Sequence, residues 1–288
     1  MQNDLRRGAL FAICAAAAFS VTGVCIKTAS IHAPNEVVVF IRSAVSLLTL
    51  LPWVLRRGVS ILYTQRLGGH LWRAGFGVCA MYAFFYGIAH LQLAAAMLLT
   101  YSTPLFVPFI AWFWIKEKPP MVVFPAVLVG LIGIAFIVKP GAEDLKLFAS
   151  LVGISSGIFA ACAMVSIRRI SDTEPTPRIV FYFAALATLI SAVPLFWFWK
   201  TPDLRTLAAL VAAGVSATVG QLCLTQAYVC APAARVGPFT YMAVIFSALL
   251  AWLIWGENPD RWFVLGSILV IATCVMVGWR RKEPQMEE

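Results

Sequence analysis

An internal duplication constrains this sequence more than any other feature. A shift of 140 residues places four residues of the first half on identical residues of the second: Tyr101 on Tyr241, Trp112 on Trp252, Glu117 on Glu257 and Pro119 on Pro259. Self-similarity at a fixed offset indicates one structural unit that occurs twice. The polar stretch 139–146 separates the two copies, so we predict two units, residues 1–140 and residues 141–288.

The composition places both units in a membrane. Hydrophobic residues make up 61% of the chain and charged residues 12%, with a mean hydropathy of +0.86, so polar groups are too few to cover a water-facing surface. A helical crossing needs roughly 20 apolar residues. Ten such stretches fit the sequence: 8–29, 35–55, 72–90, 94–115, 121–138, 147–167, 178–199, 206–228, 233–255 and 262–279. No stretch alternates like a barrel strand, so we predict an all-α integral membrane protein with ten transmembrane helices.

The first apolar stretch could be mistaken for a signal peptide, because Arg6 and Arg7 precede it. Its counterpart in the second half, at 148–166, has the same apolar character. Since the duplication requires a first helix in the mature protein, we expect this stretch to be a membrane helix.

The basic residues indicate the orientation of the chain. They fall in the connections between apolar stretches, so the net charge of +9 does not indicate a nucleic-acid partner. With a cytoplasmic N-terminus, the inner connections and the termini hold 14 of the 22 lysines and arginines, and the outer connections hold six. We therefore predict that both termini are cytoplasmic, with a short tail after the last helix. Each half has five crossings, so the second half enters from the opposite side and the repeat is inverted.

Two segments carry a resemblance to a known family: YGIAHLQLAAAMLLTYSTPLFVPFIAWFWIKEK at 86–118 and AYVCAPAARVGPFTYMAVIFSALLAWLIWGE at 227–257. They resemble the signature segments of EamA-type carriers of the drug/metabolite transporter superfamily. The resemblance covers about 8–280, including Arg42 in FIRSAVSLLTLLPW. It implies two inverted five-helix repeats around a central cavity and transport of small metabolites across a bacterial inner membrane. One departure is that Pro104 has no proline at its repeat partner, Val244.

Polar residues follow one face of two matching spans. The third span carries Tyr82, Tyr86 and His90 at every fourth position. The eighth span carries Thr218, Gln221, Thr225 and Tyr228 at spacings of three or four. Polar groups in lipid are costly and turn toward the bundle interior or a watery cavity. We predict that both stripes line a substrate cavity; the alternative is that they bond neighbouring helices.

Two tyrosines occupy equivalent places in the fourth and ninth spans, Tyr101 and Tyr241. A ring with a hydroxyl can cover an apolar substrate face and also bond a polar group, which suits amino-acid-like ligands. Substrate binding and a structural helix contact are equally consistent with this placement.

The same two spans contain Pro104, Pro108, Gly237 and Pro238. A proline removes one backbone hydrogen bond and bends a membrane helix, which creates a point at which a gate can move. We predict a hinge or gate at these residues, with a fixed kink as the alternative.

Three cations lie in or near apolar runs: Lys27, Arg42 and Arg235. We expect Lys27 to reach lipid phosphate. Arg42 and Arg235 are candidates for binding a substrate carboxylate or phosphate, because a guanidinium forms two parallel bonds. Glu117 and Glu257 end the fourth and ninth spans, and we expect them to pair with cations or backbone donors.

Three classes of function are compatible with a duplicated membrane bundle. The first, which we favour, is a secondary transporter of small metabolites, with amino acids or related amphipathic compounds as substrates, working by alternating access. The second is an integral membrane enzyme, which is disfavoured because His32, His70 and His90 are scattered and no HExxH motif or Cys/His cluster occurs. The third is an accessory membrane protein. The expected partners are a small-molecule substrate and membrane lipid, and no metal or cofactor is predicted.

Overall fold

The computed structural model describes residues 5–116, 125, 128–130, 132–133, 136, 144–170, 173–230 and 239–279. These residues form helices and no strand. The helices of the first half are α1 (Leu5–Ala29), α2 (Asn35–Arg57), η1 (Val59–Leu62), α3 (Leu67–His90), α4 (Leu93–Tyr101) and α5 (Thr103–Ile115). Those of the second half are α7 (Asp144–Ile170), α8 (Thr176–Ala192), α9 (Leu195–Phe198), α10 (Leu204–Cys230), α12 (Met242–Trp255) and α13 (Arg261–Trp279).

The helices follow the predicted apolar stretches. Within the described part of the chain, four segments are long and apolar enough to cross a membrane: Arg6–Ala29, Asn35–Arg57, Leu147–Ile167 and Leu204–Ala227. Shorter apolar helices include Thr176–Ala192, Met242–Trp255 and Arg261–Thr273. The all-helical membrane architecture is therefore confirmed. The fifth predicted span, 121–138, lies largely outside the described residues, and the count of ten crossings stays a prediction.

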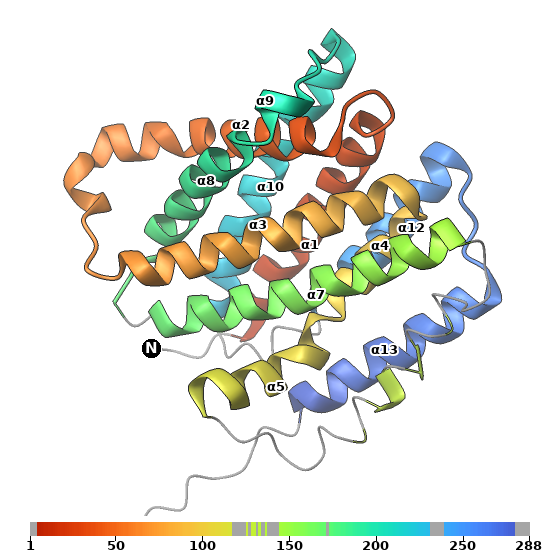
Figure 1. Cartoon of the computed structure of the whole chain (residues 1–288). Helices are drawn as coiled ribbons and strands as arrows, with labels where there is room; N and C mark the ends of the chain where they lie inside the picture. Colours follow the sequence, from red (N-terminus) through yellow and green to blue (C-terminus); the bar gives the residue numbers. More distant parts are fainter. Residues whose placement is uncertain are drawn as a thin grey trace, which may run out of the picture.

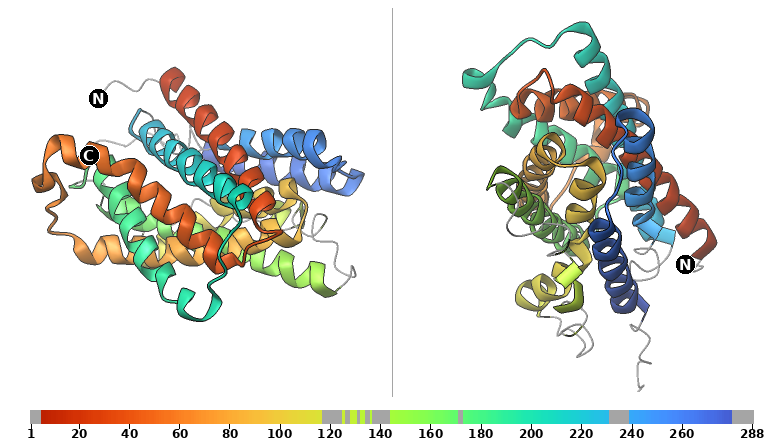
Figure 2. Two further views of the ribbon diagram at one scale, coloured as in Figure 1. Left: turned by 90° about the horizontal axis from the view of Figure 1, so that it is seen from above. Right: turned by 90° about the vertical axis from the view of Figure 1, so that its right-hand side faces the viewer.

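Each long helix packs against a helix of the other half. In Figure 1, α3 and α7 run side by side across the front, and in the left view of Figure 2, α1 lies along α10. Further contacts also join the two halves. Helix α1 contacts α12, and α7 contacts α5. Helix α2 contacts α8 and α10, and α3 contacts α8. The hydrophobic core is therefore shared by the two halves.

Small residues allow the closest of these approaches. A Cβ atom added at Gly157 of α7 would lie 2.9 Å from the carbonyl oxygen of Leu99 in α4. One added at Gly214 of α10 would lie 2.5 Å from Cβ of Val45 in α2. Because helices in lipid associate through tight packing rather than through the hydrophobic effect, such glycines determine which helix faces meet.

Hydroxyl groups connect the same helices. Among the described residues, six hydrogen bonds cross between them: Thr22 Oγ1 with Ser216 Oγ at 2.8 Å, Ser20 Oγ to Ala243 O at 3.0 Å, Ser247 Oγ to Ser20 Oγ at 3.2 Å, Ser46 Oγ to Gly214 O at 3.1 Å, Thr100 Oγ1 with Ser156 Oγ at 2.6 Å and Thr103 Oγ1 to Gly157 O at 3.2 Å. Interhelical bonds of this kind contribute roughly 0.6 kcal/mol each in membrane proteins. They add specificity to contacts that packing has already made.

The fourth predicted span is divided at Ser102, between α4 and α5. Ser102 has φ −68° and ψ −4°, and Pro104 lies in the first turn of α5, where a missing N–H is tolerated. In the second half, Tyr241 precedes α12 with φ −65° and ψ −16°. The interruption predicted near Pro104 is therefore present, whereas α5 continues through Pro108.

The two halves also end these helices alike. Lys116 after α5 and Gly256 after α12 both adopt the left-handed conformation, with φ of 59° and 67°. Their numbers differ by 140, the offset of the sequence repeat. Glycine adopts this conformation without steric cost, whereas Lys116 adopts it at a steric cost from its Cβ atom.

Candidate functional site

The predicted stripe on α3 does not share one environment. The rings of Tyr86 and His90 stack with centroids 4.1 Å apart, and Tyr86 meets Phe148 of α7 edge-on at 5.9 Å. His90 is exposed, and its Nδ1 lies 2.9 Å from the carbonyl oxygen of Tyr86. In contrast, the hydroxyl of Tyr82 is buried without a hydrogen-bond partner, and Asn35 of α2 donates to the Tyr82 carbonyl at 3.1 Å. Tyr86 and His90 therefore form a local pair, and Tyr82 stands apart from them.

On α10, the threonines of the stripe bond within their own helix. Thr225 donates to Gln221 O at 2.7 Å, and Thr218 donates to Gly214 O at 2.8 Å. Gln221 and Thr225 are half-buried, and the side chain of Tyr228 lies outside the described residues. Because α10 packs along α1 while α3 packs along α7, the two stripes have different main partners.

A cavity of about 510 Å³ lies between the start of α1 and the end of α10. Its lining residues are Arg7, Leu10, Phe11, Cys14, Gln226 and Cys230. None of them belongs to the predicted stripe, although Gln226 directly follows Thr225. In the predicted orientation, this cavity is on the cytoplasmic side.

The two predicted tyrosines lie at the helix interruptions. Tyr101 is half-buried at the end of α4, and Tyr241 is buried just before α12. Since α4 and α12 contact one another, the structure brings these two regions together. The other predicted residues of the ninth span, Arg235, Gly237 and Pro238, lie outside the described residues, as does Glu117.

Two arginines are buried within the bundle. Arg42 of α2 is 6% exposed and Arg73 of α3 is 7% exposed. The Arg73 guanidinium lies over the ring of Phe183 of α8, 4.0 Å from its centroid. The Nε atoms of both arginines are buried and have no hydrogen-bond partner, and neither side chain pairs with a carboxylate of the described residues. Arg73 is one of the 14 basic residues that we expected in the cytoplasmic connections and termini, and for Arg73 this expectation is wrong: it lies inside α3 and inside the predicted span 72–90.

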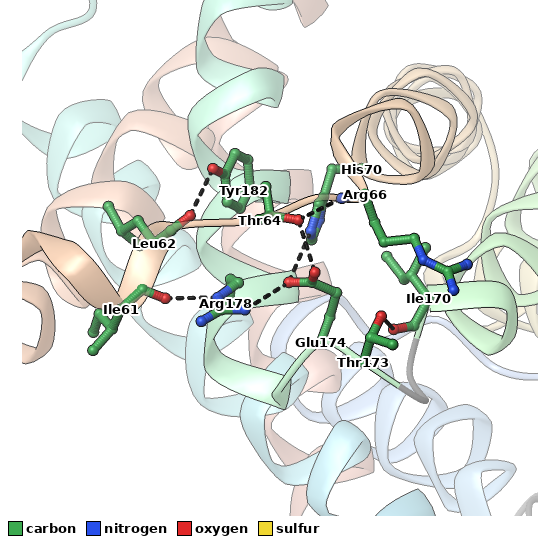
Figure 3. Close-up of polar contacts among 10 residues, drawn as sticks. All are labelled: Ile61, Leu62, Thr64, Arg66, His70, Ile170, Thr173, Glu174, Arg178 and Tyr182. Atoms are coloured by element: carbon green, nitrogen blue, oxygen red, sulfur yellow. Dashed lines mark hydrogen bonds and ion pairs between the residues drawn. The ribbon is translucent and has the colours of Figure 1, made fainter.

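A second polar group, absent from the sequence analysis, surrounds Glu174 in the connection between α7 and α8. We call Thr64, His70, Glu174 and Arg178 the Glu174 cluster (Figure 3). Glu174 accepts bonds from Thr64 Oγ1 at 2.7 Å and from Arg178 Nη1 at 3.0 Å, and His70 Nε2 lies 3.4 Å away. Burial raises the pKa of Glu174, but these bonds and the charge of Arg178 outweigh burial and hold the pKa below its usual value.

The same end carries further bonds between the halves. Arg178 Nε donates to Ile61 O at 2.6 Å, and the Tyr182 hydroxyl donates to Leu62 O at 2.8 Å (Figure 3). The rings of His70 and Tyr182 stack with centroids 4.3 Å apart. The segment after α2 is thereby joined to α8 of the second half.

At the opposite end, Lys27 of α1 forms an ion pair with Glu257, which follows α12. Glu257 also accepts from the Leu93 backbone N–H at 3.1 Å, and Lys27 donates to Leu91 O at 3.3 Å. We call Lys27, Leu91, Leu93 and Glu257 the Glu257 cluster. The predicted pairing of Glu257 with a cation and a backbone donor is confirmed. The expectation that Lys27 reaches lipid phosphate is wrong, because Glu257 is within its range.

Comparison with known proteins agrees with this architecture. The model of the EamA-like transporter family matches residues 6–139 and again residues 147–279. The pseudopaline exporter CntI of Pseudomonas aeruginosa is 36% identical over 281 residues, which cover 96% of this chain and 98% of the exporter. A riboflavin transporter of Vibrio cholerae is 27% identical, with 98% and 96% covered, and an S-adenosylmethionine uptake transporter of Rickettsia bellii is 27% identical, with 85% and 84% covered.

A solved crystal structure has the same fold, with a TM-score of 0.69, 19% identity and coverage of 94% of this chain and 97% of the other. Two matches of one family model, one in each half, also account for the duplication seen in the sequence. The chain belongs to the EamA-like transporter family, and it is a multi-pass membrane protein.

Proposed function

We propose that this protein is a secondary transporter that moves a small metabolite across the bacterial inner membrane by alternating access. Two inverted five-helix repeats, residues 1–140 and 141–288, form its moving parts, and both termini face the cytoplasm. The similar proteins named above carry small molecules, which supports transport as the function. Amino acids or related amphipathic compounds are the substrates we propose.

The proposal is carried by helix contacts that occur twice, once in each of two equivalent arrangements. Under the 140-residue shift, α1 corresponds to α7, α3 to α10 and α5 to α12. The contact of α1 with α10 then becomes that of α7 with α3, and α1 with α12 becomes α7 with α5. Contacts that map onto one another in this way support two halves that can exchange conformations, so that one arrangement opens inward and its counterpart opens outward.

Polar clusters at the two ends are suited to alternate opening. The Glu174 cluster joins Thr64 and His70 of the first half to the second half. The Glu257 cluster joins Lys27 and Leu93 of the first half to the end of α12. A substrate path between the halves opens at one end only when the cluster at that end separates.

Transport by purified protein in liposomes tests the proposal. A panel of radiolabelled amino acids, dicarboxylates and nucleosides is offered, with empty liposomes as the blank. We expect at least one solute to accumulate, and Tyr86→Ala or Gln221→Ala to reduce its uptake more than the amount of reconstituted protein. If no solute moves under any imposed gradient, transport is not the function.

The orientation needs its own test. Reporter fusions at the N-terminus and at the C-terminus are expected to report the same, cytoplasmic, side of the membrane. Reporters on opposite sides would contradict an even number of crossings and with it the inverted repeat.

A further inference from the structure

Arg42 and Arg73 place two positive charges inside a membrane bundle, where an uncompensated charge is costly. Arg42 and Arg73 are both more than nine-tenths buried, and the charge of Arg42 acts on Arg73. A cation inside a membrane protein usually pairs with a carboxylate or faces a watery path. Neither arginine forms an ion pair with a carboxylate of the described residues, so the two positive charges on the adjoining helices α2 and α3 have no counter-charge from that part of the chain.

The pair lies where the two halves meet. Arg42 belongs to α2 and Arg73 to α3, and Phe183 belongs to α8, which contacts both helices. The shift of 141 that places Phe40 on Phe181 also places Arg42 on Phe183. The two halves therefore contribute different chemistry at equivalent positions: the first contributes a cation and the second an aromatic ring. Transporters built from repeats bind their substrates at such an interface.

The surroundings hold Arg73 in place but leave its buried Nε without a hydrogen-bond partner. The Phe183 ring supports the Arg73 guanidinium from one face, where the electrons of the ring attract the cation. Gly77, one turn further along α3, leaves the necessary space, since an added Cβ would lie 2.3 Å from Arg73 Nη1 and 2.6 Å from the Phe183 ring. A guanidinium carries five N–H donors in a fixed fork, and a carboxylate accepts two of them in parallel. A guanidinium that is supported by a ring and has a buried Nε–H without a partner can receive an anion.

We propose that Arg42 and Arg73 bind carboxylate groups of the transported substrate, and that the substrates are amphipathic organic acids with at least two carboxylates, acidic amino acids included. One carboxylate would leave one buried positive charge without a counter-charge, whereas two neutralise the pair. This inference rests on the proposed transport function and specifies its substrate. Arg73 adds to the site a residue that sequence analysis placed in a connection.

Thermal unfolding of the purified protein in detergent tests the inference. The probes are succinate, glutarate and citrate, each compared with its neutral amide at the same ionic strength, and with inorganic phosphate. We expect at least one carboxylate to raise the unfolding temperature in proportion to its concentration, and the amides to have no effect. A rise with phosphate alone would replace the organic acid with a phosphate ester as substrate. A panel without any shift would overturn the inference.

Variants assign the shift to the arginine pair. Arg42→Gln and Arg73→Gln are expected to abolish it, while Arg56→Gln, an exposed arginine on the same helix as Arg42, keeps it. Because two like charges repel, Arg42→Gln is also expected to leave the ligand-free unfolding temperature unchanged or higher, whereas a purely structural arginine would lower it. Gly77→Ala should weaken the shift without removing a charge. A shift that survives in Arg42→Gln and Arg73→Gln would overturn the assignment.

Transport separates this inference from the proposed function. If the wild-type protein moves a solute without a carboxylate, and Arg42→Gln moves it equally well, the inference fails and transport stands. If the wild-type protein binds succinate or citrate but moves no solute, the binding site stands and transport fails.

Discussion

At each end of the bundle a glutamate joins the two halves, but the two carboxylates differ in burial and in number of partners. In the Glu174 cluster the carboxylate is 3% exposed and is surrounded by Thr64, His70 and Arg178. In the Glu257 cluster the carboxylate is 19% exposed and has one lysine and one backbone N–H. A buried carboxylate depends on all of its partners, whereas a partly exposed one is also solvated by water. We therefore infer that the end near Glu257 separates at the lower cost.

Glu174→Gln is expected to have the largest effect. The neutral amide cannot satisfy Arg178 and Thr64 as the carboxylate does, and removing one partner of a buried ion pair costs about 3 kcal/mol. Thermal unfolding in detergent measures the loss. Glu36→Gln in the first turn of α2 serves as the control, since it removes a glutamate charge outside both clusters. Equal stability of Glu174→Gln and the wild type would remove the basis of the comparison.

Acid should weaken the end of the bundle that holds Glu174. The pKa of Glu174 is lowered in the folded protein, so its stabilisation is complete above the ordinary glutamate pKa of about 4.3 and is lost as the pH falls through the lower folded value. The wild-type unfolding temperature is therefore expected to fall on acidification below that ordinary value. Unfolding scans across this range should show a smaller fall in Glu174→Gln, and parallel curves for the two proteins would contradict the assignment.

Lys27→Met is expected to have a smaller effect, of about 1 kcal/mol, because the ion pair with Glu257 is partly exposed. Methionine keeps most of the apolar stem of Lys27 and removes the ammonium, which also lies 5.2 Å from the centroid of the Trp255 ring. Combining Lys27→Met with Glu257→Gln isolates the pair, because the second change should add little once the first is present. Full additivity of the two changes would mean that the ion pair contributes nothing.

Tyr182→Phe, at the end that holds the Glu174 cluster, is expected to have the smallest effect on stability. It removes the hydroxyl that donates to Leu62 O and keeps the ring that stacks on His70, so we expect a loss of about 1 kcal/mol or less. Unfolding temperature is again the measurement. A loss as large as that of Glu174→Gln would show that the hydroxyl, rather than the carboxylate, holds this end together.

The predictable features of this protein are those that repeat or lie within one segment. The duplication, the apolar helices and the interruption near Pro104 follow from local patterns and from the 140-residue offset. The Glu174 cluster could not be predicted, because it requires Thr64 and Glu174, which are far apart in sequence, to meet. Arg73 was misassigned because a cation near the start of a span looks like part of the preceding connection. The signal for a buried Arg73 was Gly77, four residues later on the same helix face, because a glycine there leaves room for the arginine side chain.

The packing of each long helix against a helix of the other half has a consequence for biogenesis. When the first half has left the ribosome, α1 has not yet met α10 and α3 has not yet met α7, so the faces that these helices bury against each other are still without their partners. Because the two halves follow one another in the chain, the newly made first half lacks the helices against which it packs until the second half is synthesised. We therefore expect the protein to be most open to degradation between the synthesis of the two halves, and a pause in translation near residue 140 to prolong that stage.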